Sequence, residues 1–240
     1  MEIKLKIGIL LTDHVLEDLQ EKHGDQTDFY TRLFDSMEPS ITLRFYDVVK
    51  GEYPKHNDEC NGYIITGSRL SVYDEDQWIK DLEKYICELH KNKKSLIGVC
   101  FGHQLIAKAL GGLSGEAESG WAVGVQKYSF KRTFPWVKNQ KTSIALIHSH
   151  KDQVKVLPPS AHLVAGNEKV PISMYFIGNH IMSMQGHPEF TSEYAFDVAT
   201  KRHEILGREL FHSAKRSLKN DKTDNLEVVK WWVDFLRYNQ

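Results

Sequence analysis

Short apolar runs of strand length alternate with longer amphipathic stretches over the first half of the chain. Apolar runs at 3–11, 41–48 and 62–65 predict three strands, and the last is apolar enough to lie in the middle of a parallel sheet. Residues 28–37 and 77–91 place apolar side chains at helical spacing between these strands. Strands that alternate with helices in this way predict an α/β fold.

The pattern changes after residue 112, where shorter and more turn-rich apolar runs replace the alternation. Strands of mixed or antiparallel pairing are predicted at 123–130, 143–148, 162–165 and 172–177. The last of these leads through a Gly178-Asn179 turn into a strand at 181–184, which is the pattern of a hairpin.

The last fifty residues predict helices. Apolar periodicity indicates helices near 192–206 and 226–238, and the charged stretch between them, 215–224, is expected to be a solvated connector. No repeat and no Pro- or Gly-rich linker divides the chain. We therefore expect one domain over residues 1–240, with a core at 1–190 and a C-terminal helical extension at 191–240.

Charge and cysteine content restrict the class of function. The chain has 240 residues and a formal net charge of −1, which favours neither nucleic acid nor an anionic membrane as partner. Its three cysteines have no paired spacing, so neither a disulfide framework nor a Cys-x-x-Cys metal site is indicated. With no signal-peptide pattern and no membrane-spanning apolar run, we expect a soluble cytoplasmic protein with a small-molecule substrate and without metal or cofactor.

One cysteine stands where a predicted strand meets a predicted helix. Residues 95–99 form an apolar run of strand length, and apolar side chains follow at helical spacing over 103–110. Cys100 lies between them, flanked by Gly98 and Gly102, in the pattern of a nucleophile elbow. A helix N-terminus stabilises a thiolate, so Cys100 is a candidate nucleophile. The alternative is a small buried hydrophobic residue.

His187 is the candidate base among twelve histidines. It follows the strand predicted at 181–184, and Pro188 and Glu189 come directly after it. A carboxylate in a rigid loop orients an imidazole and stabilises its charged form, as the third member of a Cys/His/carboxylate triad does. The carboxyl ends of strands meet at one edge of an open α/β sheet, so His187 and Cys100 are expected to face one cleft. The rival bases are His103, His148 and His150.

Four short motifs follow one another along the chain: Ile64-Ile65-Thr66-Gly67-Ser68, Gly98-Val99-Cys100-Phe101-Gly102-His103-Gln104, His148-Ser149-His150-Lys151-Asp152-Gln153-Val154 and His187-Pro188-Glu189. Together they resemble the class I (triad) glutamine amidotransferase family, over roughly residues 1–190. The run over 66–74 is similar to stand-alone GMP-synthase-like proteins. The resemblance implies a flavodoxin-like, open and mostly parallel sheet flanked by helices, with a small mixed or antiparallel strand region and C-terminal helices.

The resemblance also implies roles for individual residues. Cys100 would attack a γ-glutamyl amide, His187 would activate the thiol, and Glu189 would orient His187. Backbone N–H groups of Gly67, Ser68 and Phe101 would form an oxyanion hole. The substrate would be contacted by Gln104, Ser149, His150, Lys151 and Asp152. Two positions depart from the family pattern, Arg69 after the first turn and Lys151 in the later loop; either their charges serve a substrate carboxylate or both are solvated surface cations.

Three functions remain open. The first is hydrolysis of glutamine through a γ-glutamyl thioester, with the ammonia passed to a separate synthase, because the 51 residues after Glu189 hold no ATP-binding phosphate loop. The second is a γ-glutamyl peptidase that needs no synthase partner. The third is a non-catalytic regulatory or binding relative, which the intact Cys100, His187 and Glu189 argue against.

Overall fold

A nine-stranded sheet organises the computed structural model, which describes residues 4–38, 40–137 and 141–239. Its order is β2-β1-β3-β4-β11-β10-β9-β6-β7, and β5 and β8 form a separate antiparallel pair. The strands are β1 (Lys6–Leu11), β2 (Thr42–Asp47), β3 (Gly62–Ile65), β4 (Ser95–Val99), β5 (Leu113–Glu116), β6 (Ala122–Phe130), β7 (Ser143–His150), β8 (Asp152–Val156), β9 (Ala161–Gly166), β10 (Met174–Ile177) and β11 (Ile181–Met184).

The sheet is parallel from β2 to β11 and antiparallel from β11 to β7. This arrangement confirms the α/β fold with a parallel core and an antiparallel region. β11 pairs in parallel with β4, with Met184 opposite Val99. The two residues that follow these strands, Cys100 and Gln185, therefore leave the same edge of the sheet.

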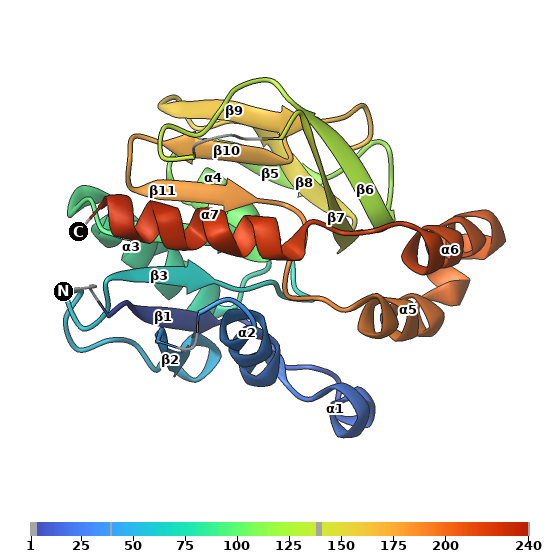
Figure 1. Ribbon diagram of the computed structural model, residues 1–240, viewed down its shortest axis with the longest axis horizontal. Coiled ribbons are helices and arrows are strands. Elements are labelled where there is room, and N and C mark those ends of the chain that lie inside the picture. Colours follow the sequence, from blue (N-terminus) through green and yellow to red (C-terminus); the bar gives the residue numbers. More distant parts are fainter. Residues whose placement is uncertain (1–3, 39, 138–140, 240) are drawn as a thin grey trace.

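Helices cover both faces of the sheet (Figure 1). They are α1 (Glu17–His23), α2 (Gln26–Asp35), α3 (Gln77–Lys91), α4 (Phe101–Ala109), α5 (Ser192–Lys201), α6 (His203–Asn220) and α7 (Asn225–Tyr238), with a short 3-10 turn at Val48–Lys50. α2 and α7 pack on one face, where Phe34 of α2 lies against Trp232 of α7. α3 and α4 pack on the other face through a second buried cluster.

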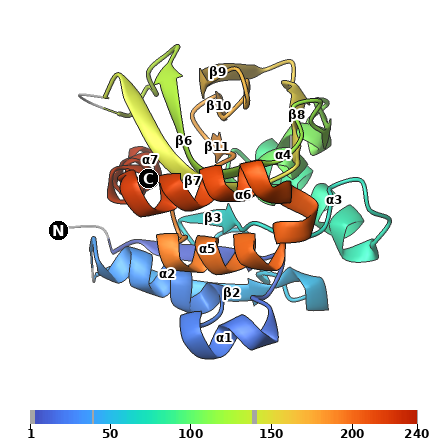
Figure 2. The ribbon, with the colours of Figure 1, turned by 90° about the vertical axis from the view of Figure 1, so that its right-hand side faces the viewer.

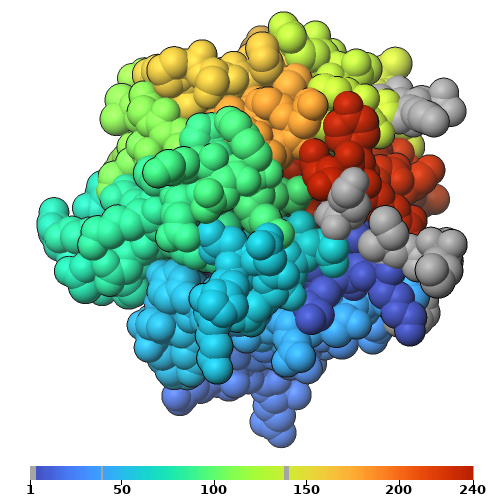
Figure 3. Space-filling model, turned by 90° about the vertical axis from the view of Figure 1, so that its left-hand side faces the viewer, coloured from blue at the N-terminus to red at the C-terminus, as the bar shows by residue number. Residues whose placement is uncertain are grey.

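α5 and α6 lie at the edge where the parallel strands end, in front of the sheet in Figure 2. The opposite side of the molecule, in Figure 3, shows the end of α7 in red and α3 in blue-green on opposite halves of the surface. The helices α5 and α6 therefore stand beside the edge from which Cys100 and the segment after β11 emerge.

Two predictions for the C-terminal region are wrong. The helix expected over 192–206 is two helices, because α5 ends at Lys201 and the backbone turns at Arg202 before α6 begins. The solvated connector expected over 215–224 is helix as far as Asn220. Leu218 in that segment and Ala214 one turn before it are buried on one face of α6, so the charged side chains occupy the outer face.

Within the described ranges, no helix combines the length and the apolar character needed to cross a membrane.

Candidate functional site

Cys100 lies at a strained turn between β4 and α4. Its φ of 50° and ψ of −99° belong to a region that residues with a side chain rarely adopt. The turn is tight because α4 packs directly on β3: a Cβ at Gly102 would lie 2.5 Å from the Ile65 carbonyl oxygen. This is the geometry predicted for a nucleophile elbow, and it exposes the sulfur to the cavities at the sheet edge.

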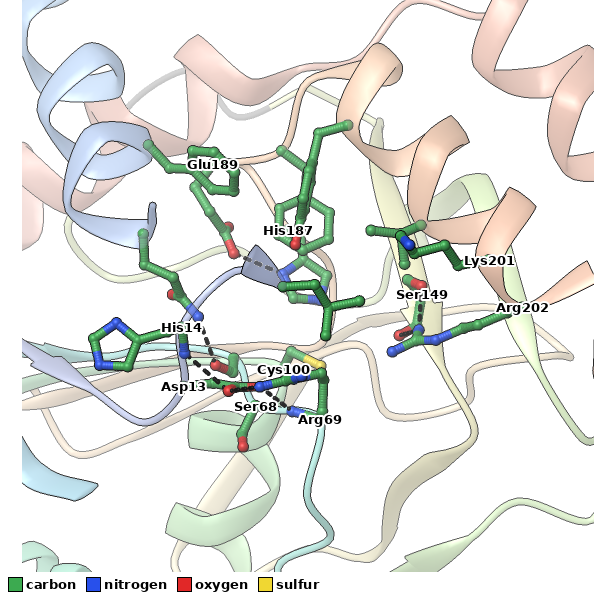
Figure 4. A pocket seen from close by; sticks show the side chains of 17 residues that line it. Asp13, His14, Ser68, Arg69, Cys100, Ser149, His187, Glu189, Lys201 and Arg202 are labelled. Carbon is green, nitrogen blue, oxygen red and sulfur yellow. Dashed lines mark hydrogen bonds and ion pairs between the residues drawn. The ribbon is translucent and has the colours of Figure 1, made fainter. Parts of the chain in front are cut away.

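His187 faces Cys100 and is held in place from three sides. Its Nδ1 lies 2.6 Å from Glu189 Oε1, its backbone N–H donates to the Ile147 carbonyl at 2.8 Å, and its ring stacks on Phe190 with centroids 3.9 Å apart. Figure 4 shows the imidazole beside the Cys100 sulfur. Burial disfavours the charged imidazole, but the negative charges of Glu189 and Cys100 outweigh it and raise the pKa of His187 to about 10.

The three rival histidines are buried in a different environment. Burial lowers the pKa of His103 and of His150 to about 3, and it lowers the pKa of His148 well below the usual value. The His103 ring lies between the Ser183 hydroxyl at 2.7 Å and the Ile172 carbonyl at 3.1 Å. His148 and His150 contact each other through ring nitrogens 2.7 Å apart. Burial therefore favours the neutral form of all three rings, whereas the surroundings of His187 favour its charged form.

The Gly67-Ser68 turn lies directly over the Cys100–His187 pair. A Cβ at Gly67 would lie 2.8 Å from His187 Cε1 and 3.5 Å from Cys100 Cβ, so only glycine lets the backbone come this close. Phe101 N–H is the first amide of α4 and has no acceptor inside the helix. The turn and the helix N-terminus, both predicted to supply the oxyanion hole, thus adjoin the same sulfur.

Two cavities meet at Cys100. The first, of about 240 Å³, is lined by His187 and Glu189 and by an apolar wall of Leu16, Phe29, Phe190, Tyr194 and Val198. The second, of about 300 Å³, is lined by the five predicted substrate contacts, Gln104, Ser149, His150, Lys151 and Asp152, together with Phe101. Gln104 is fixed there by its amide, which donates to the Asp152 carbonyl at 2.7 Å and to Gln185 Oε1 at 3.1 Å.

The described residues include no cluster of three or more His, Cys, Asp or Glu side chains that could hold a metal ion.

The family model of class-I glutamine amidotransferases matches residues 32–201. The chain belongs to the class-I glutamine amidotransferase family. Gamma-glutamyl peptidase 5 of Arabidopsis thaliana is 30% identical over 201 residues, which cover 80% of each protein. Gamma-glutamyl peptidase 3 of the same plant is 27% identical over 247 residues, 99% of this chain and 98% of that protein. A glutamine amidotransferase structure from Thermotoga maritima matches 98% of this chain and 97% of its own with a TM-score of 0.72 at 19% identity, a likeness of fold.

The two cations that depart from the family pattern each form an ion pair within this chain. Arg69 pairs with Asp13 through its guanidinium at 2.7 Å, and Lys151 pairs with Glu116 at 2.7 Å. Each charge therefore already has a carboxylate beside it. Both are partly exposed cations with a protein carboxylate as partner, which favours the surface-cation alternative over a charge reserved for a substrate carboxylate.

Sequence reasoning missed Arg202, which lines both cavities together with Cys100. Its guanidinium donates to the Ser149 hydroxyl at 2.7 Å and lies 5.2 Å over the Trp121 ring. The only signal in the sequence was a single arginine inside a stretch predicted to be continuous helix. Arg202 lies at the C-terminal end of α5, because that helix ends at Lys201.

Proposed function

We propose that this chain hydrolyses γ-glutamyl amides through a γ-glutamyl thioester on Cys100, with His187 as acid and base and Glu189 as the carboxylate that holds His187. The observation that supports the proposal most is the geometry around one sulfur: a strained cysteine at a helix N-terminus, an imidazole with a raised pKa and a carboxylate 2.6 Å behind it. An imidazolium beside a thiol stabilises the thiolate, which is the reactive form.

In the first step the Cys100 thiolate forms a bond to the γ-carbonyl carbon. The carbonyl oxygen becomes an oxyanion and accepts hydrogen bonds from the N–H groups of Ser68 and Phe101. The carbon–nitrogen bond then breaks as His187 gives its proton to the leaving amine. In the second step His187 takes a proton from water, the resulting hydroxide attacks the thioester, and glutamate leaves as the sulfur becomes thiolate again.

The lining of the two cavities supports a proposal for which half of the substrate binds in each. His187 must reach the leaving amine, and it lines the first cavity, whereas Gln104 and Asp152 line the second. We infer that the γ-glutamyl group occupies the second cavity and the leaving group the first. The first cavity measures about 240 Å³, whereas a molecule the size of ammonia or water needs only about 15 Å³. A leaving group as large as an amino acid uses that space, which favours a γ-glutamyl peptide as substrate.

Two Arabidopsis relatives are named gamma-glutamyl peptidases, which supports the same substrate class. Glutamine is the second candidate, because the family model is named for glutamine. In that case the ammonia would pass to a separate synthase subunit. Both functions use the same thioester chemistry and differ only in the leaving group.

A panel of substrates tests the proposal. Purified chain is incubated with glutamine, γ-glutamyl-alanine and γ-glutamyl-leucine, and glutamate release is measured. We expect higher kcat/KM for the dipeptides than for glutamine, no turnover by Cys100→Ser, and full activity for the matched control Cys87→Ser, since Cys87 lies on the exposed side of α3. A preference for glutamine would favour the second candidate, and no glutamate release from any of the three by folded protein would refute the proposal.

A further inference from the structure

Arg202 carries a positive charge that no carboxylate neutralises within the described part of the chain. The other arginine and the lysine that line the first cavity each form an ion pair, Arg69 with Asp13 and Lys201 with Asp18. Arg202 instead contacts the hydroxyl and carbonyl oxygens of Ser149, which carry no net charge. Burial lowers the pKa of Arg202, but an arginine stays charged at any physiological pH.

The negative charges of Cys100 and Asp13 favour the charged form of this half-buried guanidinium, but no described carboxylate forms an ion pair with it, so a ligand carboxylate would supply the missing partner. Arginine presents a planar set of N–H donors that matches a carboxylate, and Ser149 uses only one edge of that set. The remaining donors face the cavities that contain Cys100. The site is therefore suited to an anionic group on a bound substrate.

The position of Arg202 in the chain indicates which half of the substrate bears that group. Tyr194 and Val198 precede it by eight and four residues, so the three side chains share one side of α5 and its C-terminal end. All three line the first cavity. An apolar side chain that lies along Tyr194 and Val198 would bring a carboxylate of the same leaving group to Arg202.

We propose that Arg202 binds the carboxylate of the leaving group, so that the substrates are γ-glutamyl amides of amino acids or peptides with a free carboxylate and an apolar side chain. This inference rests on the proposed function and specifies its substrate. Arg202 is a specificity-determining residue here, and the triad residues act on the amide in the same way with or without it.

The test compares γ-glutamyl-leucine with γ-glutamyl-leucinamide, which differ only in the leaving-group carboxylate. A charge-assisted hydrogen bond predicts that the full chain prefers the acid by roughly 10- to 100-fold in kcat/KM. In Arg202→Gln the preference falls to near one, because activity on the acid drops much further than activity on the amide. The control Arg208→Gln, an exposed arginine on α6, keeps the full preference.

Equal loss on both substrates in Arg202→Gln would overturn the inference, since it would mean that Arg202 serves the γ-glutamyl half or the fold. So would a wild-type enzyme that hydrolyses both substrates equally well. Calorimetric binding to Cys100→Ser separates this inference from the proposed function, because it needs no turnover. There, γ-glutamyl-leucine should bind more tightly than the amide only while Arg202 is present.

Discussion

The side-chain amide of Gln26 donates to the backbone carbonyl of Gly67 at 3.1 Å. The Thr12 hydroxyl lies 3.0 Å from the same oxygen. Because a trans peptide directs its N–H opposite to its C=O, these contacts fix the direction of the Ser68 N–H. On the other side of Ser68, the Arg69 N–H donates to Asp13 at 2.8 Å. Two segments, Thr12-Asp13 and the start of α2, thus hold both peptide groups of the proposed oxyanion turn.

Gln26→Leu should slow catalysis without weakening substrate binding. The variant keeps the Thr12 contact but removes the other hydrogen bond to the Gly67 carbonyl, so the Ser68 N–H is less firmly aligned with the oxyanion. We expect kcat to fall roughly tenfold, less than for direct loss of an oxyanion donor, with KM unchanged. Steady-state kinetics against the control Gln77→Leu, an exposed glutamine of α3, measure this. Unchanged kcat would show that the hydrogen bond does not position the turn.

Gly67→Ala should be severely impaired. The added methyl group would lie 2.8 Å from His187 Cε1, so either the turn or the imidazole must shift. A displacement of this size at a reacting group costs on the order of 100-fold in kcat/KM. The control is Gly115→Ala, whose nearest neighbour would be 4.0 Å away. Near-normal activity of Gly67→Ala would contradict the close approach of the turn to His187.

Glu189→Gln should move the alkaline limit of activity to lower pH. Glu189 raises the pKa of His187, so its charge keeps the imidazole protonated up to about pH 10, and the leaving amine needs that proton. Removing the charge lowers the pKa of His187 by about 1 to 3 units, and activity is lost earlier as pH rises. The pH profile of kcat/KM measures the shift, with Glu193→Gln, an exposed residue of α5, as control. If Glu189→Gln and wild type lost activity at the same alkaline pH, Glu189 would not be the carboxylate that stabilises the protonated His187.

The buried, neutral His103 should make the protein less stable in mild acid. Burial lowers the pKa of His103 to about 3, whereas in the unfolded chain the pKa is about 6.5. As pH falls below 6.5, the imidazole of the unfolded chain binds a proton, whereas the buried imidazole of the native state stays neutral. The free energy of unfolding therefore falls by about 1 kcal/mol for each unit of decreasing pH. Urea titrations at pH 6 and pH 5 should show this loss reduced by about 1 kcal/mol in His103→Asn.

The exposed His212 provides the matched control, and His212→Asn should keep the wild-type pH dependence. If His103→Asn also kept the wild-type pH dependence of stability, the His103 ring would have to be charged in the native state.

The sequence predicts those parts of the site that lie on strongly patterned elements. β3, α3 and β11 have the predicted bounds, and Cys100 and His187 meet because each follows a strand of the parallel core. The strands β5 and β8 were not anticipated. They pair with each other outside the main sheet and leave Leu113 and Val156 exposed, so neither shows the pattern of a half-buried strand.

The sequence does not predict the role of Arg202 or the hydrogen bond from Gln26 to Gly67, for a different reason. Both depend on contacts between segments far apart in the chain, from Gln26 to Gly67 and from Arg202 to Ser149. Periodicity indicates which face of an element is buried, but it does not indicate which polar groups meet across elements. The charge balance that distinguishes Arg202 from Arg69 follows only from the position of Asp13.

Capture of the acyl-enzyme tests the central claim most directly. The protein is mixed with γ-glutamyl-leucine, quenched in acid within the first turnover, digested and analysed by peptide mass spectrometry. We predict a γ-glutamyl group on the peptide that contains Cys100, with none on the Cys60 or Cys87 peptides and none in Cys100→Ser. Turnover of the substrate with Cys100 unmodified throughout, or turnover by Cys100→Ser, would contradict the account.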